Sequence, residues 1–301
     1  TQATSTSAAV ADSATTSALH ADYKLLSAND WRTLITTVPG SGRIRGVHVY
    51  NDVVYAFRDN AGATAKVMHK STSSGWSAIT LPTEISFGIL TLSTTVTISN
   101  ATPGVVTEAA HGMANGQPIQ LSTTGALPTG LLPATTYYVV NKAANTYELA
   151  ATVGGASIAT TSAGSGTHTR LMIGNTIAAG STVTGRTSGA TGVVAAPLLR
   201  TGTWTVAPVG TLVLTGITGT FQSGEGLSVA GLFVTQTTSL ATAITLAVGG
   251  VGEYFNHNFS GSTATTKMYG CDGVNPAFEF DGTNYIPIHT GMTTDTPLHV
   301  T

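Results

Sequence analysis

The stretch Gly46-Val-His-Val-Tyr-Asn-Asp-Val-Val-Tyr-Ala-Phe57 decides the fold class, because it predicts a β-hairpin. Large apolar residues recur at every second position on both sides of Asn51-Asp52, and this dipeptide favours a tight turn. Two more short strands are expected, at Lys66–Lys70 and Trp76–Leu81. About four strands within roughly 40 residues are typical of one blade of a β-propeller.

The C-terminal segment repeats this style. Lys267–Gly270, Ala277–Phe280 and Tyr285–Ile288 predict three short strands, and Asp-Gly pairs at 272–273 and 281–282 separate them with turns. We therefore expect a first blade at 41–85 and a return to the same propeller-like domain at 253–301.

Residues 86–252 form a long, nearly uncharged insertion between these flanks. Its 167 residues hold only seven of the 26 charged side chains, whereas residues 20–70 hold eleven. The chain has 55 Thr and 35 Gly residues, which suit half-exposed strands and tight turns. We expect two small β-sandwich or barrel-like modules, at 86–170 and 171–252.

The second of these modules contains an internal repeat. Five positions recur 44 residues later: Ile173, Thr176, Ile177, Gly180 and Val183 match Ile217, Thr220, Phe221, Gly224 and Leu227. Repetition at a fixed period predicts two equivalent β-halves, in which matching apolar positions are buried.

Residues 1–40 are expected to be a linker followed by one short helix. Residues 1–19 are Ser, Thr and Ala with one Asp. Ser27 and Asp30 are spaced like a capping box, and Trp31, Leu34 and Ile35 follow at helical spacing. The predicted fold is thus all-β: a partial propeller with a two-module insertion and one N-terminal helix. The chain begins without Met and stops within a motif, so we expect it to be part of a longer polypeptide.

Composition excludes several classes of function. The net charge of −2 gives no electrostatic footprint for nucleic acid or an acidic membrane. The single Cys271 excludes an internal disulfide and a four-cysteine zinc site. No apolar run approaches the roughly 20 residues of a membrane span. Charged residues make up 9% of the chain against about 25% in ordinary domains, which favours a surface that is buried in an assembly.

No residue pattern predicts a catalytic, cofactor-binding or metal site. The histidines at 20, 48, 69, 111, 168, 257, 289 and 299 lack ligand spacing. Asp272 and Asp281 precede glycines and are better explained as turn residues than as paired glycosidase carboxylates. Gly164-Ser-Gly166 is not a phosphate loop, and Cys271 is expected to be a structural thiol.

A local basic cluster surrounds the first predicted blade. It comprises Arg43, Arg45, Arg58, Lys66 and Lys70. Such a face suits DNA passing through a channel. We favour a rim of alternating charge at a subunit contact instead, because Asp52 and Asp59 interleave with the basic residues.

Three motifs carry a resemblance to tailed-bacteriophage proteins. His111-Gly-Met-Ala-Asn-Gly-Gln-Pro-Ile-Gln-Leu-Ser122 and Thr184-Gly-Arg-Thr-Ser-Gly-Ala-Thr-Gly-Val-Val194 each resemble a small β-module of phage tail structural proteins. The flanks, with Met268-Tyr-Gly-Cys-Asp-Gly-Val-Asn275, resemble propeller-containing tail proteins, and most of all the tail nozzle proteins of short-tailed phages. The resemblance covers about residues 27–301.

This resemblance implies a structural protein in the tail of the virion, without enzymatic activity and without a cofactor. The implied partners are further copies in a ring-shaped homo-oligomer, other tail proteins such as the adaptor and tail fibre, and passing genomic DNA. One alternative is a tail-fibre or receptor-binding protein that contacts a host glycan, and another is a tail depolymerase. The insertion contains only seven aromatic residues, which favours the structural interpretation.

Overall fold

The computed structural model describes residues 36–88, 93–259, 261–292 and 295–299. They form two compact units: one runs up to Leu81 and resumes at Thr245, and the other runs from Pro82 to Ile244. Apart from the 3₁₀ turn η1 (Thr263–Thr265), all regular structure in the described residues is strand. The predicted all-β class is therefore confirmed.

The helix predicted around Ser27 and Trp31 lies outside the described residues. Within the ranges that the structure describes, no helix has both the length and the apolar character needed to cross a membrane.

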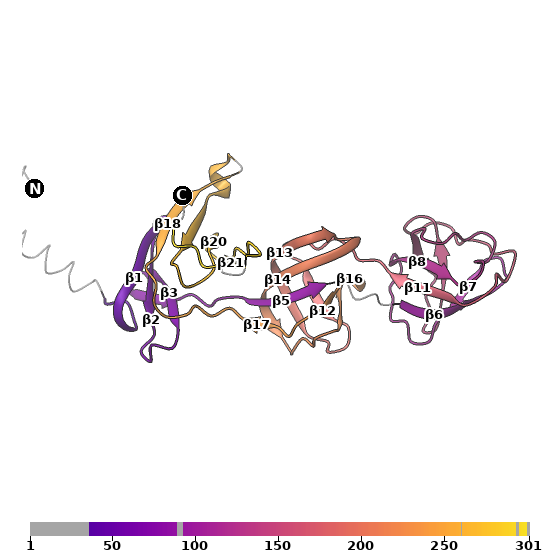
Figure 1. The fold of residues 1–301 in the computed structure, drawn as a ribbon, viewed down its shortest axis with the longest axis horizontal. Helices are drawn as coiled ribbons and strands as arrows, with labels where there is room; N and C mark the ends of the chain where they lie inside the picture. Colours follow the sequence, from indigo (N-terminus) through magenta and orange to yellow (C-terminus); the bar gives the residue numbers. More distant parts are fainter. Residues whose placement is uncertain (1–35, 89–92, 260, 293–294, 300–301) are drawn as a thin grey trace, which may run out of the picture. The chain divides into compact units, whose positions relative to one another are not determined.

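The first unit begins with a four-stranded antiparallel sheet. Its strands are β1 (Ser41–Tyr50), β2 (Val53–Asp59), β3 (Lys66–Thr72) and β4 (Gly75–Ala78), paired in sequence order (Figure 1). The predicted hairpin is present, since Tyr50 pairs with Val53. Asn51 and Asp52 have φ values of 48° and 60°, the left-handed conformation that a two-residue hairpin turn requires at both central positions.

A second four-stranded sheet completes this unit. It consists of β18 (Glu253–His257), β19 (Lys267–Cys271), β20 (Phe278–Phe280) and β21 (Tyr285–Pro287), again in sequence order. The register aligns Tyr254 with Gly270 and Phe278 on one face. The other face carries Phe255 and its partner Tyr269. Each sheet has the strand number and order of a propeller blade.

Aromatic side chains join the two sheets in one core. The ring of Phe57 stacks on that of Tyr254 with centroids 4.9 Å apart, and the ring of Tyr55 meets that of Phe280 edge-on at 5.2 Å. Gly46 permits the close approach, because a Cβ atom there would overlap the Tyr254 ring. The flanks of the insertion therefore belong to one unit, as the sequence predicts.

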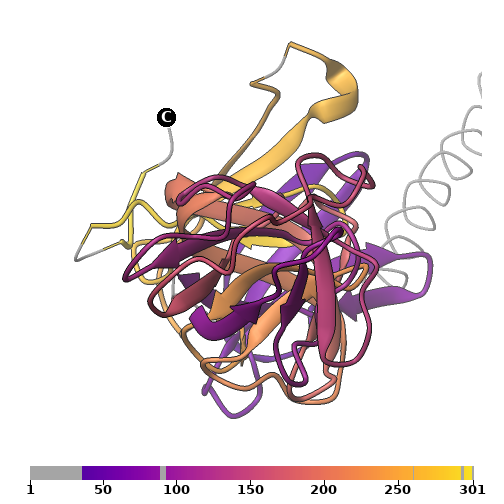
Figure 2. The ribbon, with the colours of Figure 1, turned by 90° about the vertical axis from the view of Figure 1, so that its right-hand side faces the viewer.

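The second unit contains a closed six-stranded barrel (Figure 1, Figure 2). Its strands are β6 (Ser93–Ile98), β7 (Val105–Thr107), β8 (Pro118–Thr123), β9 (Tyr137–Val140), β10 (Thr146–Ala150) and β11 (His168–Met172). The order around the barrel is β10-β7-β6-β11-β8-β9. The core is filled by inward residues of these strands, including Ile119, Leu121 and Tyr147.

The other module of this unit is a second sheet that closes on itself. It contains β5 (Thr83–Gly88), β12 (Thr182–Gly185), β13 (Thr191–Thr203), β14 (Val206–Thr218), β15 (Gly226–Val229), β16 (Leu232–Thr237) and β17 (Thr242–Ala243). Its order is β14-β13-β12-β15-β16-β5-β17, and β14 also pairs with β5. Six strands therefore form a ring around a core that includes Phe87 and Phe221.

The boundaries of the insertion differ from the predicted 86 and 252. The unit starts at Pro82 and ends at Ile244, whose N–H donates to the Pro82 carbonyl at 3.0 Å. Strand β5 was expected to end the first blade and begin the first module, but it belongs to the sheet of the second module. The reason is burial: Ile85 and Phe87 complete that module's core. The six-stranded barrel is thus inserted between β5 and β12 of the second module.

The internal repeat is structural. Ile177 and Phe221 are both buried, and so are Val183 and Leu227. Strands β12 and β15 pair antiparallel at the centre of the sheet. The ring order places β13 and β14 on one side of this pair and β16 and β5 on the other. The module therefore has an approximate two-fold arrangement of three strands each.

Candidate functional site

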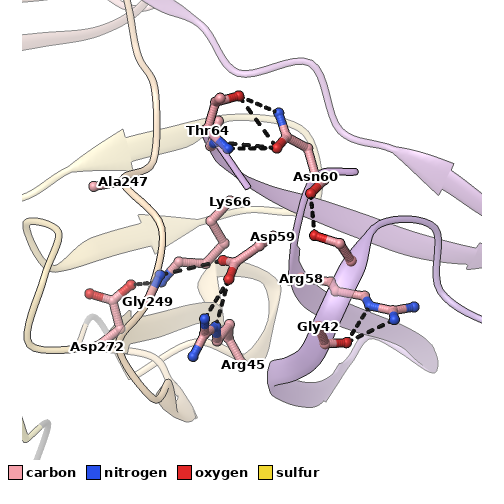
Figure 3. A network of polar contacts seen from close by, with 12 residues as sticks. Gly42, Arg45, Arg58, Asp59, Asn60, Thr64, Lys66, Ala247, Gly249 and Asp272 are labelled. Atoms are coloured by element: carbon pink, nitrogen blue, oxygen red, sulfur yellow. Dashed lines mark hydrogen bonds and ion pairs between the residues drawn. The ribbon is translucent and has the colours of Figure 1, made fainter. Parts of the chain in front are cut away.

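The densest polar network of the first unit links β1, β2 and β3 to the segments that flank β18 and β19 (Figure 3). Lys66 forms an ion pair with Asp272, and the Lys66 side chain is only 1% exposed. Arg45 Nε donates to Asp59 Oδ2 at 3.0 Å, and the Gly249 N–H donates to Asp59 Oδ1 at 3.4 Å. The network ties the N-terminal sheet to the returning chain.

The electrostatics of this network keep both carboxylates ionised. The hydrogen bond from Arg45 is the main reason that the pKa of Asp59 lies below its usual value. Burial alone would raise the pKa of Asp272, but the bonds from Lys66 and Asn275 outweigh burial and lower it. A carboxylate held in this way is a poor proton shuttle, and the arrangement is that of a structural ion pair.

Asp272 and Asp281 occupy the same kind of turn. In each, Oδ1 accepts two backbone N–H bonds. For Asp272 the donors are Val274 and Asn275, at 2.9 and 2.7 Å. For Asp281 they are Thr283 and Asn284, at 2.8 and 2.6 Å. In each, Oδ2 accepts from the side-chain amide of the Asn three residues on. The sequence Asp-Gly-x-Asn is common to both, and both side chains have the turn role that the sequence predicts.

Cys271 is buried beside this network. Burial, together with the charges of Glu253 and Asp272, raises the pKa of its thiol to about 11. At neutral pH little of this thiol is ionised, so it is a poor nucleophile, as expected of a structural cysteine.

The histidines are scattered over both units. In the barrel, His111 contacts the Tyr147 ring and His168 Nδ1 lies 2.9 Å from the Thr123 hydroxyl. In the first unit, His69 is buried, and its pKa is lowered by that burial. His48 contacts Asn256, and His299 contacts Glu253. The ring of His257 lies against that of Phe259, and His289 follows β21. His20 is outside the described residues. Among the described residues, no three His, Cys, Asp or Glu side chains form a group suited to a metal ion.

The basic cluster predicted from the sequence is largely used for internal contacts. Lys66 and Arg45 are held by carboxylates of their own unit. Arg58 donates to the carbonyl oxygens of Gly42 and Val38. Of the cluster, only Arg43 and Lys70 are exposed. The interleaved Asp59 pairs within the unit, so it is not available for the subunit contact that the sequence suggested.

A buried ion pair in the barrel was missed by the sequence analysis. Glu108 and Arg170 are 5% and 4% exposed and contact each other, and Tyr147 Oη donates to Glu108 Oε2 at 3.0 Å. Burial and the charge of Glu108 raise the pKa of Tyr147. A signal was present in the sequence: isolated charges in an almost uncharged module are either exposed or paired.

Glu225 plays a similar structural part in the second module. Its carboxylate accepts backbone N–H bonds from Gln222, Ser188 and Thr187 at 2.6, 3.0 and 3.2 Å. Burial opposes ionisation, but these bonds outweigh it and lower the pKa of Glu225. The carboxylate thereby joins the turn after β12 to the loop before β15.

An aromatic patch with partly and fully exposed rings lies on the outer face of the C-terminal sheet. It consists of Phe255, His257, Phe259 and Tyr269. Phe255 and Tyr269 stack with centroids 5.4 Å apart, and Phe259 is 74% exposed. Lys267 and Glu279 form an ion pair on the neighbouring strands. Exposed rings beside charged groups are suited to binding a partner rather than to catalysis.

Comparison with known proteins adds one similarity. No protein-family model matches the chain, and no curated protein matches it. The solved structure "Phage phi92 endosialidase" is similar over 83% of this chain, with 13% sequence identity and a TM-score of 0.22. The chain spans 47% of that protein, or about half its length. A likeness at this TM-score shows neither a shared fold nor a shared activity.

Proposed function

We propose that this chain is a structural protein of a bacteriophage tail, a subunit of the tail nozzle or of a tail-tube ring, and that it acts without turnover. The observation that carries the proposal is the use of the buried carboxylates. Asp59 and Glu108 are bound by arginines, and Glu225 is bound by turn amides. In the described residues, this use of the buried acids supports stabilising roles for them. The resemblance of both inserted modules and both flanks to tail proteins supports the proposed class of assembly.

The exposed face of β1 supports an assembly contact. Ile44, Val47 and Val49 are 45%, 53% and 53% exposed, and β1 lies at the edge of its sheet. The carbonyls of Arg45 and Val49 on this edge already accept bonds from Gly252 and Asn256, so it is the exposed apolar side chains that favour association with another chain. In the proposed ring, this strand contacts a neighbouring copy, and the inserted modules cover neighbouring tail proteins.

The oligomeric state of the purified protein tests this proposal. Mass photometry should show closed oligomers, and negative-stain images should show rings. The double variant Val47→Lys, Val49→Lys should shift the protein to monomers without unfolding it. Val153→Lys is the matched control, because Val153 is 68% exposed in the barrel module and lies outside this strand. A wild-type protein that stays monomeric, or forms trimers that the double variant leaves intact, would contradict the ring.

The aromatic patch favours a second candidate, a receptor-binding protein that contacts a host glycan. Stacked Phe255 and Tyr269 provide flat apolar faces, and Lys267 and Glu279 provide hydrogen-bonding groups nearby. Binding of host-cell polysaccharide that is lost in Phe259→Ala, combined with a trimeric assembly, would favour this candidate over the ring.

A further inference from the structure

The two four-stranded sheets of the first unit correspond strand by strand. In each, four antiparallel strands pair in sequence order. Strands β1 and β18 run side by side in the same direction, because the Gly252 N–H donates to the Arg45 carbonyl at 2.8 Å and Asn256 Nδ2 donates to the Val49 carbonyl at 2.9 Å. Both bonds join residues 207 positions apart. A rotation that places β1 on β18 therefore matches each residue of β1 with the residue 207 positions later.

This correspondence matches the inner face of the first sheet with the outer face of the second. His48 and its strand partner Tyr55 face the core between the sheets, where each contacts a ring of the second sheet. The residue that matches His48 is Phe255, and the strand partner of Phe255 is Tyr269. These two residues belong to the aromatic patch. The patch is thus the equivalent of a face that, in the first sheet, is covered by another sheet.

The same correspondence identifies the face that would cover the patch. Within the chain, His48 is covered by Asn256, whose Oδ1 lies 2.8 Å from His48 Nε2, and by the ring of Tyr254. The residues of the first sheet that match Asn256 and Tyr254 are Val49 and Val47. Both lie on the outward face of β1 and are 53% exposed. An exposed aliphatic face on one side of the unit therefore corresponds to the face that packs on the equivalent of the patch.

The two outer faces carry charges of opposite sign. On the outer face of the first sheet, Arg58 donates to backbone carbonyl oxygens, which do not neutralise its charge. On the outer face of the second sheet, the Glu253 side chain is 47% exposed beside His299, while Lys267 and Glu279 neutralise each other. A contact between the two unlike faces therefore brings opposite charges together. Two copies that met through the same face would instead oppose like charges.

We propose that the aromatic patch of one copy packs against the outward face of β1 in the next copy, so that the contact between copies repeats the contact between the two sheets of one chain. Val49 of one copy then lies against Phe255 of its neighbour, as Asn256 lies against His48 within the chain. Such a contact joins two different surfaces, and heterologous contacts of this kind generate rings when the rotation closes. The inference rests on the proposed ring and identifies the surface that receives β1.

Cysteine crosslinking of the full chain tests this pairing. Copies with Val49→Cys and copies with Phe255→Cys, co-expressed with different affinity tags, should be joined to each other by a short bismaleimide. Neither variant alone should crosslink above the wild-type level, because like positions do not meet in a head-to-tail contact and Cys271 is buried. Val153→Cys, at an exposed position of the barrel, replaces Val49→Cys in the control. Crosslinks between two Val49→Cys copies, or none between the mixed copies, would overturn the proposal.

Mass photometry of patch variants separates this inference from the proposed function. Phe259→Lys and Glu253→Arg should each weaken self-association about tenfold without unfolding the chain, since Phe259 is 74% exposed and Glu253 is half exposed. Val153→Lys is again the control.

Three results would refute the inference. A monomeric wild-type protein would refute the ring and the inference together. Closed oligomers that depend on Val47 and Val49 but not on Phe259 and Glu253 would leave the ring and refute the inference alone. Assembled oligomers that bind host polysaccharide, and lose that binding in Phe259→Lys, would show that the patch is free and would also refute it.

Discussion

Thr184 and Ser228 pair directly across strands β12 and β15, and each occupies the other's position in the 44-residue repeat. Because the strands run antiparallel, two equivalent residues of the repeat that face each other lie on either side of the local two-fold axis. The axis of the second module therefore passes between these two residues. The module consists of two equivalent halves. The third strand of the second half is β5, which precedes the inserted barrel in the sequence.

The two halves should contribute similarly to stability. Leu227 and Val183 are both fully buried in the shared core. Leu227→Ala should lower the free energy of unfolding by about 3 kcal/mol, and Val183→Ala by a similar though smaller amount, since each leaves a cavity. Leu240→Ala should change it by less than about 0.5 kcal/mol because Leu240 is 60% exposed. Urea unfolding measures all three. A large loss for one half and none for its mate would contradict the equivalence.

Two threonines on β16 should respond in opposite directions to the same substitution. The Thr235 hydroxyl is buried without a hydrogen-bond partner, so Thr235→Val should raise the free energy of unfolding by about 1 kcal/mol. The Thr237 hydroxyl donates to the Gln222 carbonyl at 2.6 Å and accepts from the Glu225 N–H at 3.0 Å. Thr237→Val should therefore lower it by about 1 to 3 kcal/mol. Equal effects of the two changes in thermal or urea unfolding would show that the hydroxyl contacts are wrong.

Asp272 and Asp281 have the same turn geometry but differ in one partner. Asp281→Asn keeps the oxygen that accepts the Thr283 and Asn284 backbone amides and loses only the exposed bond from the Asn284 side chain, so it should cost no more than about 1 kcal/mol. Asp272→Asn also keeps its turn, yet it removes the charge that pairs with buried Lys66. It should cost about 3 to 5 kcal/mol, and a combined Lys66→Met, Asp272→Asn variant should recover part of that loss. If both single variants unfold at the wild-type urea concentration, the ion pair contributes nothing.

Acid should unfold the protein through its paired carboxylates. The pKa values of Asp59, Asp272 and Glu225 are lowered in the folded state. The unfolded chain therefore binds more protons below about pH 4, and its carboxyl groups titrate near 3.9 and 4.3. The stabilisation is fully present above about pH 5 and is lost as the pH falls through the folded-state values. Urea midpoints measured from pH 7 to pH 3 should fall slightly below about pH 6.5, because the unfolded chain protonates His69 before the folded chain does, and steeply at the acid end, where the carboxylates protonate. A midpoint that rises on acidification would contradict this account.

Local features of this fold could be predicted from the sequence. The hairpin at Asn51-Asp52 and the Asp-Gly turns depend on φ preferences and on side-chain bonds to nearby amides, which act within four residues. The repeat could be recognised in the sequence because apolar residues recur at the positions that are buried in both halves. Pairings between distant segments were not predictable, and β5 in the second module and Lys66 with Asp272 are two of them. Nothing local in either sequence specifies a partner more than 100 residues away.

The candidate sites follow the same division. The turn roles of Asp272 and Asp281 rest on neighbouring residues, and the sequence indicated them. The aromatic patch was partly visible as an aromatic-rich segment, but which rings face outward depends on strand register.

Electron cryo-microscopy of intact phage particles that carry this chain tests the central claim most directly. The account predicts many copies in a closed ring around the tail channel, with the β1 edge strand at the contact between neighbouring copies. Density for the chain only at the tips of peripheral fibres, or particles in which its removal abolishes cleavage of host polysaccharide while the tail stays complete, would contradict it.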